Sequence, residues 1–518
     1  MRRLGVLLHI TSLFGKDLIG CLGNDAIAML ETLKKAHISI WQMLPICPIG
    51  YGASPYSSPS LFANNTLLIN IEKLLEDNII TKEDYTHYFT LVEEKKKDAK
   101  FSKNKVDYSF IIQYKLPLLY KCAGCFLEEV KNNKEAEFEY QTFCKNEEYW
   151  LLDYAIFSVL NNKVKLEMPS IIELYKTKKI DNIITMYYDD IEKEKILQFL
   201  FFRQWTHFKN EAKKRNILLV GDLAMFPSYH SSDVASHSNL FYLDKNNEVE
   251  LVAGVPPDYF SSTGQLWGNP VYNWQKMKDD NYFWWRQRIK KELKLFDLLR
   301  LDHFRGFHAF WAIPSSENTA KNGSWIKAGG IDFFKSLQDE LQTQKLPLIA
   351  EDLGIITPDV YSLKNMFKLK GMKILQFAFN AQEYKNKNIT SSYLPHNIES
   401  ESVVYTGTHD NTTILAFAKH LLPDEKEFIT KYLGIKENSS AKTIAQHLVR
   451  LAIYSPAEIA IIPMQDICLL DEDSRMNVPG AKDGNWEWRL SSSTLKESII
   501  ENIIDMVIIY GRYNKSFD

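Results

Sequence analysis

Short, continuous apolar runs recur along most of the chain. Each ends in a polar or glycine-containing segment and is followed by apolar residues at helical spacing. Continuous apolar runs that alternate with helical patterns indicate a parallel sheet that is buried on both faces. Repetition of this unit eight times predicts a (β/α)8 TIM barrel. The runs lie at residues 4–9, 38–44, 217–222, 298–302, 346–351, 372–377, 403–406 and 458–463.

A different pattern fills the region between Ala53 and Val220. It contains one glycine, Gly124, and is rich in Lys and Glu, with apolar residues at helical spacing. This pattern predicts helices joined by polar turns. We therefore expect a large, mainly helical insertion after the second strand.

The two patterns suggest a division of the chain into domains. Residues 1–69 would form the first barrel strands and the start of the catalytic domain, and residues 70–200 the helical insertion subdomain. Residues 201–518 would form the remainder of the catalytic barrel, including a lid loop at 254–270. The other strand-end insertions are expected to be smaller.

Composition and charge narrow the class of protein. The 518 residues are 45% hydrophobic and 25% charged, as in ordinary globular proteins. A net charge of −3 offers no basic field for nucleic acid or for an anionic membrane. The apolar runs are far shorter than the ~20 residues of a membrane span, and the first stops at His9, too early for a signal peptide. We therefore expect a cytoplasmic protein.

The six cysteines are widely spread and do not resemble a disulfide framework. Cys122 and Cys125 have the spacing of a redox or zinc pair. However, a second such pair and a pair of histidines are missing nearby. A structural thiol pair is the preferred interpretation, with metal or redox chemistry as the alternative.

Four of the predicted strands lead into a carboxylate. The third ends at Asp222, the fourth at Asp302 and the fifth at Glu351, and the seventh is followed by Asp410. Since barrels of this class build their active sites at the C-terminal ends of the strands, these side chains are expected to converge. A single carboxylate could be a helix cap or part of a loop salt bridge. Four at corresponding positions favour a catalytic site.

Local spacing distinguishes the candidate carboxylates further. Arg300 and Asp302 are two residues apart in a strand and point to the same face, where the guanidinium would keep Asp302 ionised, as a nucleophile requires. Glu351 and Asp352 are adjacent, so only one can face the pocket. We expect this to be Glu351, which has the longer side chain, and assign Asp352 a structural role.

Longer motifs around these residues resemble those of the 4-α-glucanotransferases (amylomaltase or disproportionating enzyme, glycoside hydrolase family 77). The resemblance covers nearly the whole chain and is looser at 70–200 and after residue 490. The catalytic motifs are Arg300-Leu-Asp-His-Phe-Arg-Gly, Glu351-Asp-Leu-Gly-Ile-Ile-Thr-Pro and Tyr405-Thr-Gly-Thr-His-Asp-Asn-Thr. Others are Trp41-Gln-Met-Leu-Pro, Gly50-Tyr-Gly-Ala-Ser-Pro-Tyr, Gly254-Val-Pro-Pro-Asp-Tyr-Phe-Ser and Gly264-Gln-Leu-Trp-Gly-Asn-Pro.

The resemblance implies a role for each motif residue. Asp302 would be the nucleophile, Glu351 the general acid/base, and Asp410 a third carboxylate that stabilises the distorted sugar. Substrate contacts are implied at Arg300, His409, Asp222, Tyr51, Ser54, Tyr56, Asp258, Tyr259, Phe260, Gln265, Trp267 and Asn477. Departures from the family pattern at Ala224, His230 and Ala235 lie at the rim and concern acceptor preference rather than catalysis. A further departure occurs at Thr412.

The chemistry explains these residue types. Cleavage with retention needs one ionised and one protonated carboxyl group, roughly 5–5.5 Å apart. The charge of Asp302 would help to keep Glu351 protonated. A transferase must also exclude water, and the aromatic side chains of the lid suit that task by offering faces to glucose rings. An ordinary loop with buried aromatics is the alternative for the lid, and a structural corner is the alternative for Tyr56.

We therefore expect a 4-α-glucanotransferase that moves α-1,4-glucan segments between maltooligosaccharides, without a metal or other cofactor. The alternatives are an α-amylase-like hydrolase and, from a different class, a catalytically inactive glucan-binding protein. Expected partners are maltooligosaccharides and α-1,4-glucans, with no nucleic acid and no membrane. The protein is expected to be a monomer or a homodimer.

Overall fold

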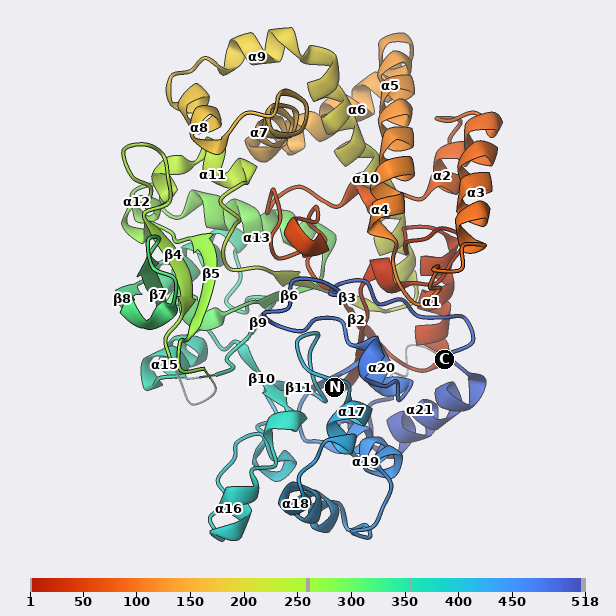
Figure 1. Ribbon diagram of the computed structural model, residues 1–518, viewed down its shortest axis with the longest axis vertical. Helices are drawn as coiled ribbons and strands as arrows, with labels where there is room; N and C mark the ends of the chain where they lie inside the picture. The colour runs from red at the N-terminus through yellow and green to blue at the C-terminus, as the bar shows by residue number, and fades with distance from the viewer. Residues whose placement is uncertain (1, 258–260, 355, 514–518) are drawn as a thin grey trace.

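The protein, represented by a computed structural model, is described over residues 2–257, 261–354 and 356–513. Eight parallel strands close into a barrel at the centre of the molecule (Figure 1). The predicted (β/α)8 fold is confirmed, and each predicted apolar run overlaps one barrel strand. In order around the barrel, the strands are β1 (Arg3–Leu7), β12 (Ile459–Pro463), β11 (Ser402–Tyr405), β10 (Lys370–Ile374), β9 (Leu348–Ala350), β6 (Leu298–Leu301), β3 (Leu218–Leu223) and β2 (Ile40–Gln42).

The barrel strands are buried on both sides, as their continuous apolar runs predict. Every residue of β11 and β12 is buried. A single hydrophobic cluster extends from the barrel into the insertion. Because parallel strands bring all their C-terminal ends to one rim, the segments that follow β3, β6, β9 and β11 meet there.

The mainly helical insertion lies between β2 and β3 and forms the top and right of the molecule in Figure 1. Its longest helix, α10, packs against α5 and α7 and leads back into the barrel. The division into domains stays a prediction, and its boundary at residue 200 falls inside α10. The helices are α2 (Ile71–Glu76), α3 (Lys82–Lys96), α4 (Tyr108–Phe110), a π-helical segment (Ile111–Lys115), α5 (Leu116–Asn132), α6 (Lys134–Asn146), α7 (Glu148–Ser158), α8 (Met168–Lys176), α9 (Ile180–Met186) and α10 (Tyr188–Lys214).

A buried ion pair joins this insertion to a loop that follows β1. Lys115 and Asp17 are both buried, and Lys115 Nζ lies 2.9 Å from Asp17 Oδ2. Asp17 Oδ1 also accepts hydrogen bonds from the Tyr88 hydroxyl (2.8 Å) and the Leu18 amide (2.7 Å). Lys115 Nζ donates a second bond to the Leu67 carbonyl (2.9 Å). Each charge is therefore matched and hydrogen-bonded.

A small antiparallel sheet beside the barrel is a feature that the sequence did not predict. Its strand order is β5 (Gln265–Pro270), β4 (Leu251–Val255), β7 (Ala309–Pro314) and β8 (Ser324–Lys327). The two ends of the predicted lid segment, 254–270, pair as β4 and β5 and so form a hairpin, and its role as a lid stays a prediction. Gly264 adopts a φ of +68°, and a Cβ there would lie 2.3 Å from the Val255 carbonyl oxygen, so this turn requires glycine.

The remaining helices follow the barrel strands or pack around them (Figure 1). Within the described residues, none of the helices is both long and apolar enough to cross a membrane. These helices are α1 (Asn24–Lys35), α11 (Ser232–Ser236), α12 (Trp274–Asp279), α13 (Phe283–Leu295), α14 (Gly330–Leu341), α15 (Pro358–Met366), α16 (Ala381–Lys385), α17 (Ile414–Lys419), α18 (Pro423–Leu433), α19 (Ala441–Tyr454), α20 (Met464–Ile467) and α21 (Glu497–Ile509).

The predicted thiol pair lies within α5. Cys122 is buried and Cys125 is exposed, and both are free thiols. Among the residues that the structure describes, no group of three or more His, Cys, Asp or Glu side chains is arranged to hold a metal ion. Burial is the main cause that raises the pKa of the Cys122 thiol to about 12, which disfavours the reactive thiolate.

Candidate active site

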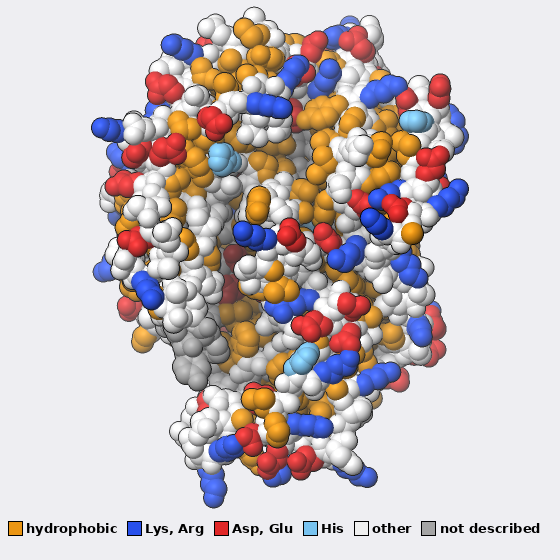
Figure 2. All heavy atoms as spheres, in the orientation of Figure 1, with side chains coloured by type: hydrophobic (Ala, Val, Ile, Leu, Met, Phe, Trp, Pro, Cys, Tyr) orange, Lys and Arg blue, Asp and Glu red, His pale blue; other side chains and the backbone are white. Residues whose placement is uncertain are grey.

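A buried arginine organises the carboxylates at the strand ends. Arg300, on β6, donates from Nη1 to Asp222 Oδ1 and Oδ2 at 2.7 and 2.9 Å, and to Asp302 Oδ1 at 2.9 Å. Arg300 and Asp302 therefore share a face, as their two-residue spacing predicts. Figure 2 shows a hollow near the middle of the molecule with acidic side chains at its bottom.

The two carboxylates on Arg300 differ in exposure. The Asp222 side chain is fully buried, whereas that of Asp302 is 29% exposed. Asp222 Oδ2 also accepts a hydrogen bond from the Tyr56 hydroxyl at 2.8 Å. Burial raises the pKa of Asp222, and the charge of Arg300 acts against that rise. Burial would lower the pKa of Arg300, but Asp222 and Asp302 hold it well above its usual value. Asp302 is thus the carboxylate that is both paired with a cation and open to a substrate.

Glu351 directly follows β9 and points into the same site. Its Oε2 accepts a hydrogen bond from the His303 amide at 2.7 Å, and its Oε1 accepts one from the Leu353 amide at 3.1 Å. Burial and then the charge of Asp302 raise the pKa of Glu351 to about 8, although Arg300 acts in the opposite direction. The carboxyl group is therefore protonated at neutral pH, and burial contributes more to this than the neighbouring charge that the sequence suggested.

The neighbour of Glu351 points the other way. Asp352 is buried, with Oδ2 2.6 Å from Lys364 Nζ and Oδ1 accepting a hydrogen bond from the Met372 amide at 2.7 Å. These contacts tie the end of β9 to α15 and β10. The contacts agree with the structural role expected for Asp352.

Asp410 lies on the loop that follows β11, and its side chain is 48% exposed. Its Oδ1 accepts a hydrogen bond from Asn477 Nδ2 at 2.6 Å and lies 3.4 Å from His409 Nε2. Arg475 Nη2 donates to its backbone carbonyl at 2.5 Å. The sequence predicted His409 and Asn477 as site residues but missed Arg475, which stands only two residues before Asn477.

Aromatic side chains line two parts of the site. The Tyr56 ring stacks on His409, with centroids 5.2 Å apart, and lies 5.5 Å from the Trp486 ring. Trp267 is 38% exposed and meets His303 edge-on at 4.9 Å. Sequence reasoning did not assign a role to Trp486, although it belongs to a segment, 485–489, that is unusually rich in tryptophan.

The other predicted substrate-binding residues are less closely tied to the carboxylates. Gln265 accepts a hydrogen bond from Trp267 Nε1 at 3.1 Å, and Ser54 Oγ accepts one from the Tyr56 amide at 3.2 Å. Tyr51 is 81% exposed. Asp258, Tyr259 and Phe260 lie outside the described residues.

Comparison with known proteins places this arrangement in a family. Residues 8–495 match the model of glycoside hydrolase family 77, which is described as 4-alpha-glucanotransferase. The chain belongs to this family. The predicted 4-α-glucanotransferase class is thereby confirmed.

Similar proteins align with the family 77 chain over nearly its full length. A 4-alpha-glucanotransferase of Aquifex aeolicus is 40% identical over 99% of this chain and 100% of its own. One of Thermus thermophilus is 39% identical over 94% of this chain and 95% of its own. The structure of an amylomaltase from Streptococcus agalactiae in complex with acarbose is 32% identical, with a TM-score of 0.90, and covers 99% of this chain and 100% of its own.

Proposed function

We propose that this protein transfers α-1,4-glucan segments from a donor maltooligosaccharide to the 4-hydroxyl of glucose or of another glucan. The observation that carries the proposal is a pair of carboxyl groups in different surroundings at the same site. Asp302 lies against the Arg300 guanidinium, whereas burial keeps Glu351 protonated, with a pKa of about 8. Retaining cleavage of a glycosidic bond needs one group of each kind.

In the first half of the reaction, an oxygen of Asp302 attacks the anomeric carbon of the donor. The bond from this carbon to the leaving oxygen breaks, and Glu351 gives its proton to that oxygen. A covalent glucosyl ester on Asp302 results. The hydrogen bond from the His303 amide and the left-handed backbone of His303 (φ 47°) fix Glu351 close to the nucleophile's own chain segment.

In the second half, Glu351 accepts the proton of the acceptor 4-hydroxyl while that oxygen attacks the anomeric carbon. The ester bond breaks, and Asp302 is restored as a carboxylate. Both transition states carry positive charge on the sugar ring, so the half-exposed carboxylate of Asp410 would stabilise them. The buried Asp222 would act mainly through Arg300 and through Tyr56.

Exclusion of water separates transfer from hydrolysis. The hairpin formed by β4 and β5 brings Trp267 against His303, beside the proposed acid/base, and its partly exposed indole offers a face to a glucose ring. These features favour transfer over an α-amylase-like hydrolase. Donors and acceptors would be maltooligosaccharides and α-1,4-glucans. We also propose a cytoplasmic location, supported by the free thiols of the chain.

The test is to incubate the protein with maltotriose, without metal or nucleotide, and to resolve the products by length. A transferase gives glucose and a ladder longer than maltotriose, with no net rise in reducing ends. A rise in reducing ends without longer products would contradict transfer and indicate a hydrolase. Unchanged maltotriose would indicate an inactive glucan-binding protein.

A further inference from the structure

The loop that carries Asp410 is fastened at both ends to one buried carboxylate. Asp466 lies on α20, directly after barrel strand β12, and is 1% exposed. Its Oδ2 accepts a hydrogen bond from the Thr406 hydroxyl, where the loop leaves β11. Its Oδ1 accepts a bond from the Ile414 amide at 2.7 Å, where the loop enters α17. Asp466 therefore fixes the distance between the two ends of the loop.

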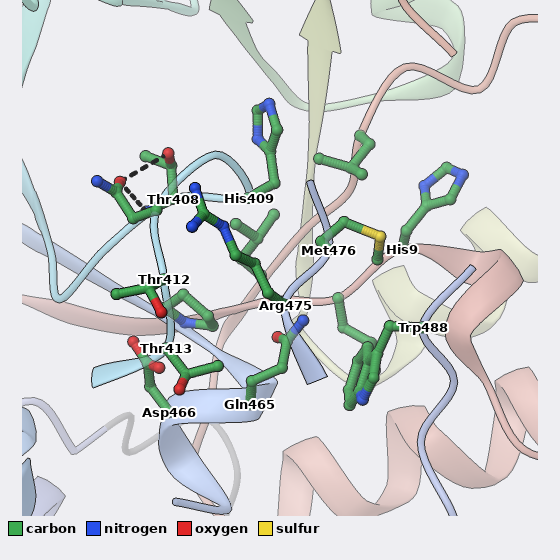
Figure 3. Close-up of a pocket in the computed structure, with 15 residues that line it drawn as sticks. His9, Thr408, His409, Thr412, Thr413, Gln465, Asp466, Arg475, Met476 and Trp488 are labelled. Atoms are coloured by element: carbon green, nitrogen blue, oxygen red, sulfur yellow. Dashed lines mark hydrogen bonds between the residues drawn. The ribbon is translucent and has the colours of Figure 1, made fainter. Parts of the chain in front are cut away.

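Figure 3 shows the surroundings of this carboxylate. Asp466 lies beside Thr412 and Thr413, on the opposite side of a cavity from His9, and the chain between Thr408 and Thr413 passes along that cavity. A loop that borders a cavity depends more strongly on the bonds that fasten its ends.

Asp410 is also held from outside the loop, by Asn477 Nδ2 on its carboxylate at 2.6 Å and by Arg475 Nη2 on its carbonyl at 2.5 Å. Further bonds lie within the loop. Asn411 Oδ1 accepts a hydrogen bond from the Thr408 amide at 2.8 Å, and Thr408 Oγ1 accepts one from the Asp410 amide at 3.3 Å. These bonds shape the turn but do not connect it to the barrel. Gln376 Nε2 donates to the Thr412 carbonyl at 2.8 Å and adds one link to the segment after β10.

We propose that Asp466 is a positioning residue, which holds the loop from Thr406 to Ile414 so that the Asp410 carboxylate stands where positive charge develops on the sugar. This inference rests on the role of Asp410 under the proposed function. Asp466 is 1% exposed, and its hydrogen bonds go to Thr406 and Ile414. It acts through the two loop ends, and a displacement of about 1 Å at a reacting group costs up to ~100-fold in rate.

The first test compares three variants by kcat, KM and thermal unfolding. Asp466→Ala removes both bonds, and we expect kcat on maltotriose to fall roughly 10- to 100-fold with a small change in KM. Asp466→Asn can still accept from the Ile414 amide and can donate to Thr406 Oγ1, so it should recover most of the loss. Thr406→Val removes one bond, keeps the side-chain shape, and should show a smaller loss. If Asp466→Ala does not fold, Thr406→Val still tests the proposal, because it removes one of the two bonds.

Asp233→Ala is the matched control. Asp233 is likewise buried, and it accepts a backbone hydrogen bond from the Leu61 amide at 2.8 Å, but it lies on α11, away from the loop. Burial raises the pKa of both carboxyls to about 6. The control should unfold at a lower temperature yet keep kcat per folded molecule. Equal kcat losses in Asp233→Ala and Asp466→Ala would overturn the positioning role.

The decisive test is a double-variant cycle that measures acarbose binding by calorimetry, which needs no turnover. Asp466→Ala and Asp410→Ala should each weaken binding by about 10-fold or more, and the double variant should bind no more weakly than Asp410→Ala alone. If the affinity loss of the double variant equals the product of the two single losses, the two residues act independently and the inference is overturned. If Asp410→Ala binds acarbose as tightly as the unaltered protein, the proposed role of Asp410 fails instead, so the two failures are distinguishable.

Discussion

Two buried networks of charged residues in this protein serve different roles, one structural and one in the candidate active site. At the junction of barrel and insertion, Asp17 meets Lys115, and hydrogen bonds from Tyr88 and Leu18 complete the coordination of its carboxylate. In the active site, Asp222 and Asp302 share the single cation Arg300, and Glu351 and Asp410 stand nearby. The first network contains the carboxylate of Asp17 with two buried cations, Lys115 and Arg489, and Arg489 donates to the Asp17 carbonyl at 2.7 Å. In the second network the carboxylates outnumber the cations.

The difference shows how a site can be recognised from its charges. A fully hydrogen-bonded ion pair has nothing left to offer a ligand. The active site, in contrast, keeps Asp302 and Asp410 partly exposed and keeps one proton on Glu351. An excess of carboxylates is costly in the free protein, and it is suited to a positively charged transition state. The predictions below follow from that contrast.

The largest expected effect is on catalysis. Asp302→Asn removes the proposed nucleophile but keeps the shape and one hydrogen-bond acceptor for Arg300. We expect transglycosylation of maltotriose to fall by about 10⁴-fold or more, with the fold retained by circular dichroism. Retention of the original rate would show that Asp302 is not the nucleophile.

A change in the junction network should lower the stability of the fold and leave catalysis unchanged. Lys115→Met leaves the buried Asp17 charge unpaired, and we expect a loss of about 3–5 kcal/mol in the free energy of unfolding. The rate per folded molecule should stay near that of the unaltered protein, measured at a temperature where the variant is folded. The matched double variant, Lys115→Met with Asp17→Asn, should regain part of the stability. A fall in rate without a loss of stability would contradict a structural role.

The pH dependence of activity should report the proton on Glu351. Because its pKa is raised to about 8, mainly by burial, the acid form is lost above that pH. We expect kcat/KM to fall about tenfold per pH unit above pH 8. A rate that stays level to pH 10 would contradict Glu351 as the general acid.

The same proton should affect stability. The folded pKa of about 8 lies above the ordinary value of about 4.3, so the contribution of this group to stability is complete below pH 4 and is lost as the pH rises through 8. Glu351→Gln stays neutral throughout. Its unfolding temperature should therefore fall less than that of the unaltered protein between pH 5 and 9. If the unfolding temperatures of the two proteins change in parallel with pH, the raised pKa is contradicted.

A small effect is expected from Tyr56→Phe. This change removes the hydroxyl bond to the buried Asp222 but keeps the ring that stacks on His409. We expect the transition state to lose about 0.5–1.5 kcal/mol of stabilisation. This loss would appear as a several-fold lower kcat/KM. A rate unchanged within error would favour the structural-corner interpretation of Tyr56.

The sequence predicts the barrel well because its eight strands are continuous apolar runs between helices. It does not predict the pairing of β4 with β5, because residues 254–270 contain the glycines and prolines typical of a loop, and β4 also pairs with the distant strand β7. The clustering of Asp222, Asp302 and Glu351 around Arg300 could be predicted because these carboxylates stand at strand ends, and their catalytic roles stay predictions. Asp466 and Arg475 were missed because neither stands in one of the recognised motifs, and their contacts with the Asp410 loop appear only in the folded chain.

The central claim is that Asp302 forms a covalent ester with the donor sugar. The most direct test is to incubate the protein with 5-fluoro-α-glucosyl fluoride, whose second fluorine slows the breakdown of the ester, and to map the added mass by peptide sequencing. We predict one 5-fluoroglucosyl unit on the peptide that contains Asp302, and none in Asp302→Asn. A label on Asp222, Glu351 or Asp410 in the unaltered protein would contradict the account.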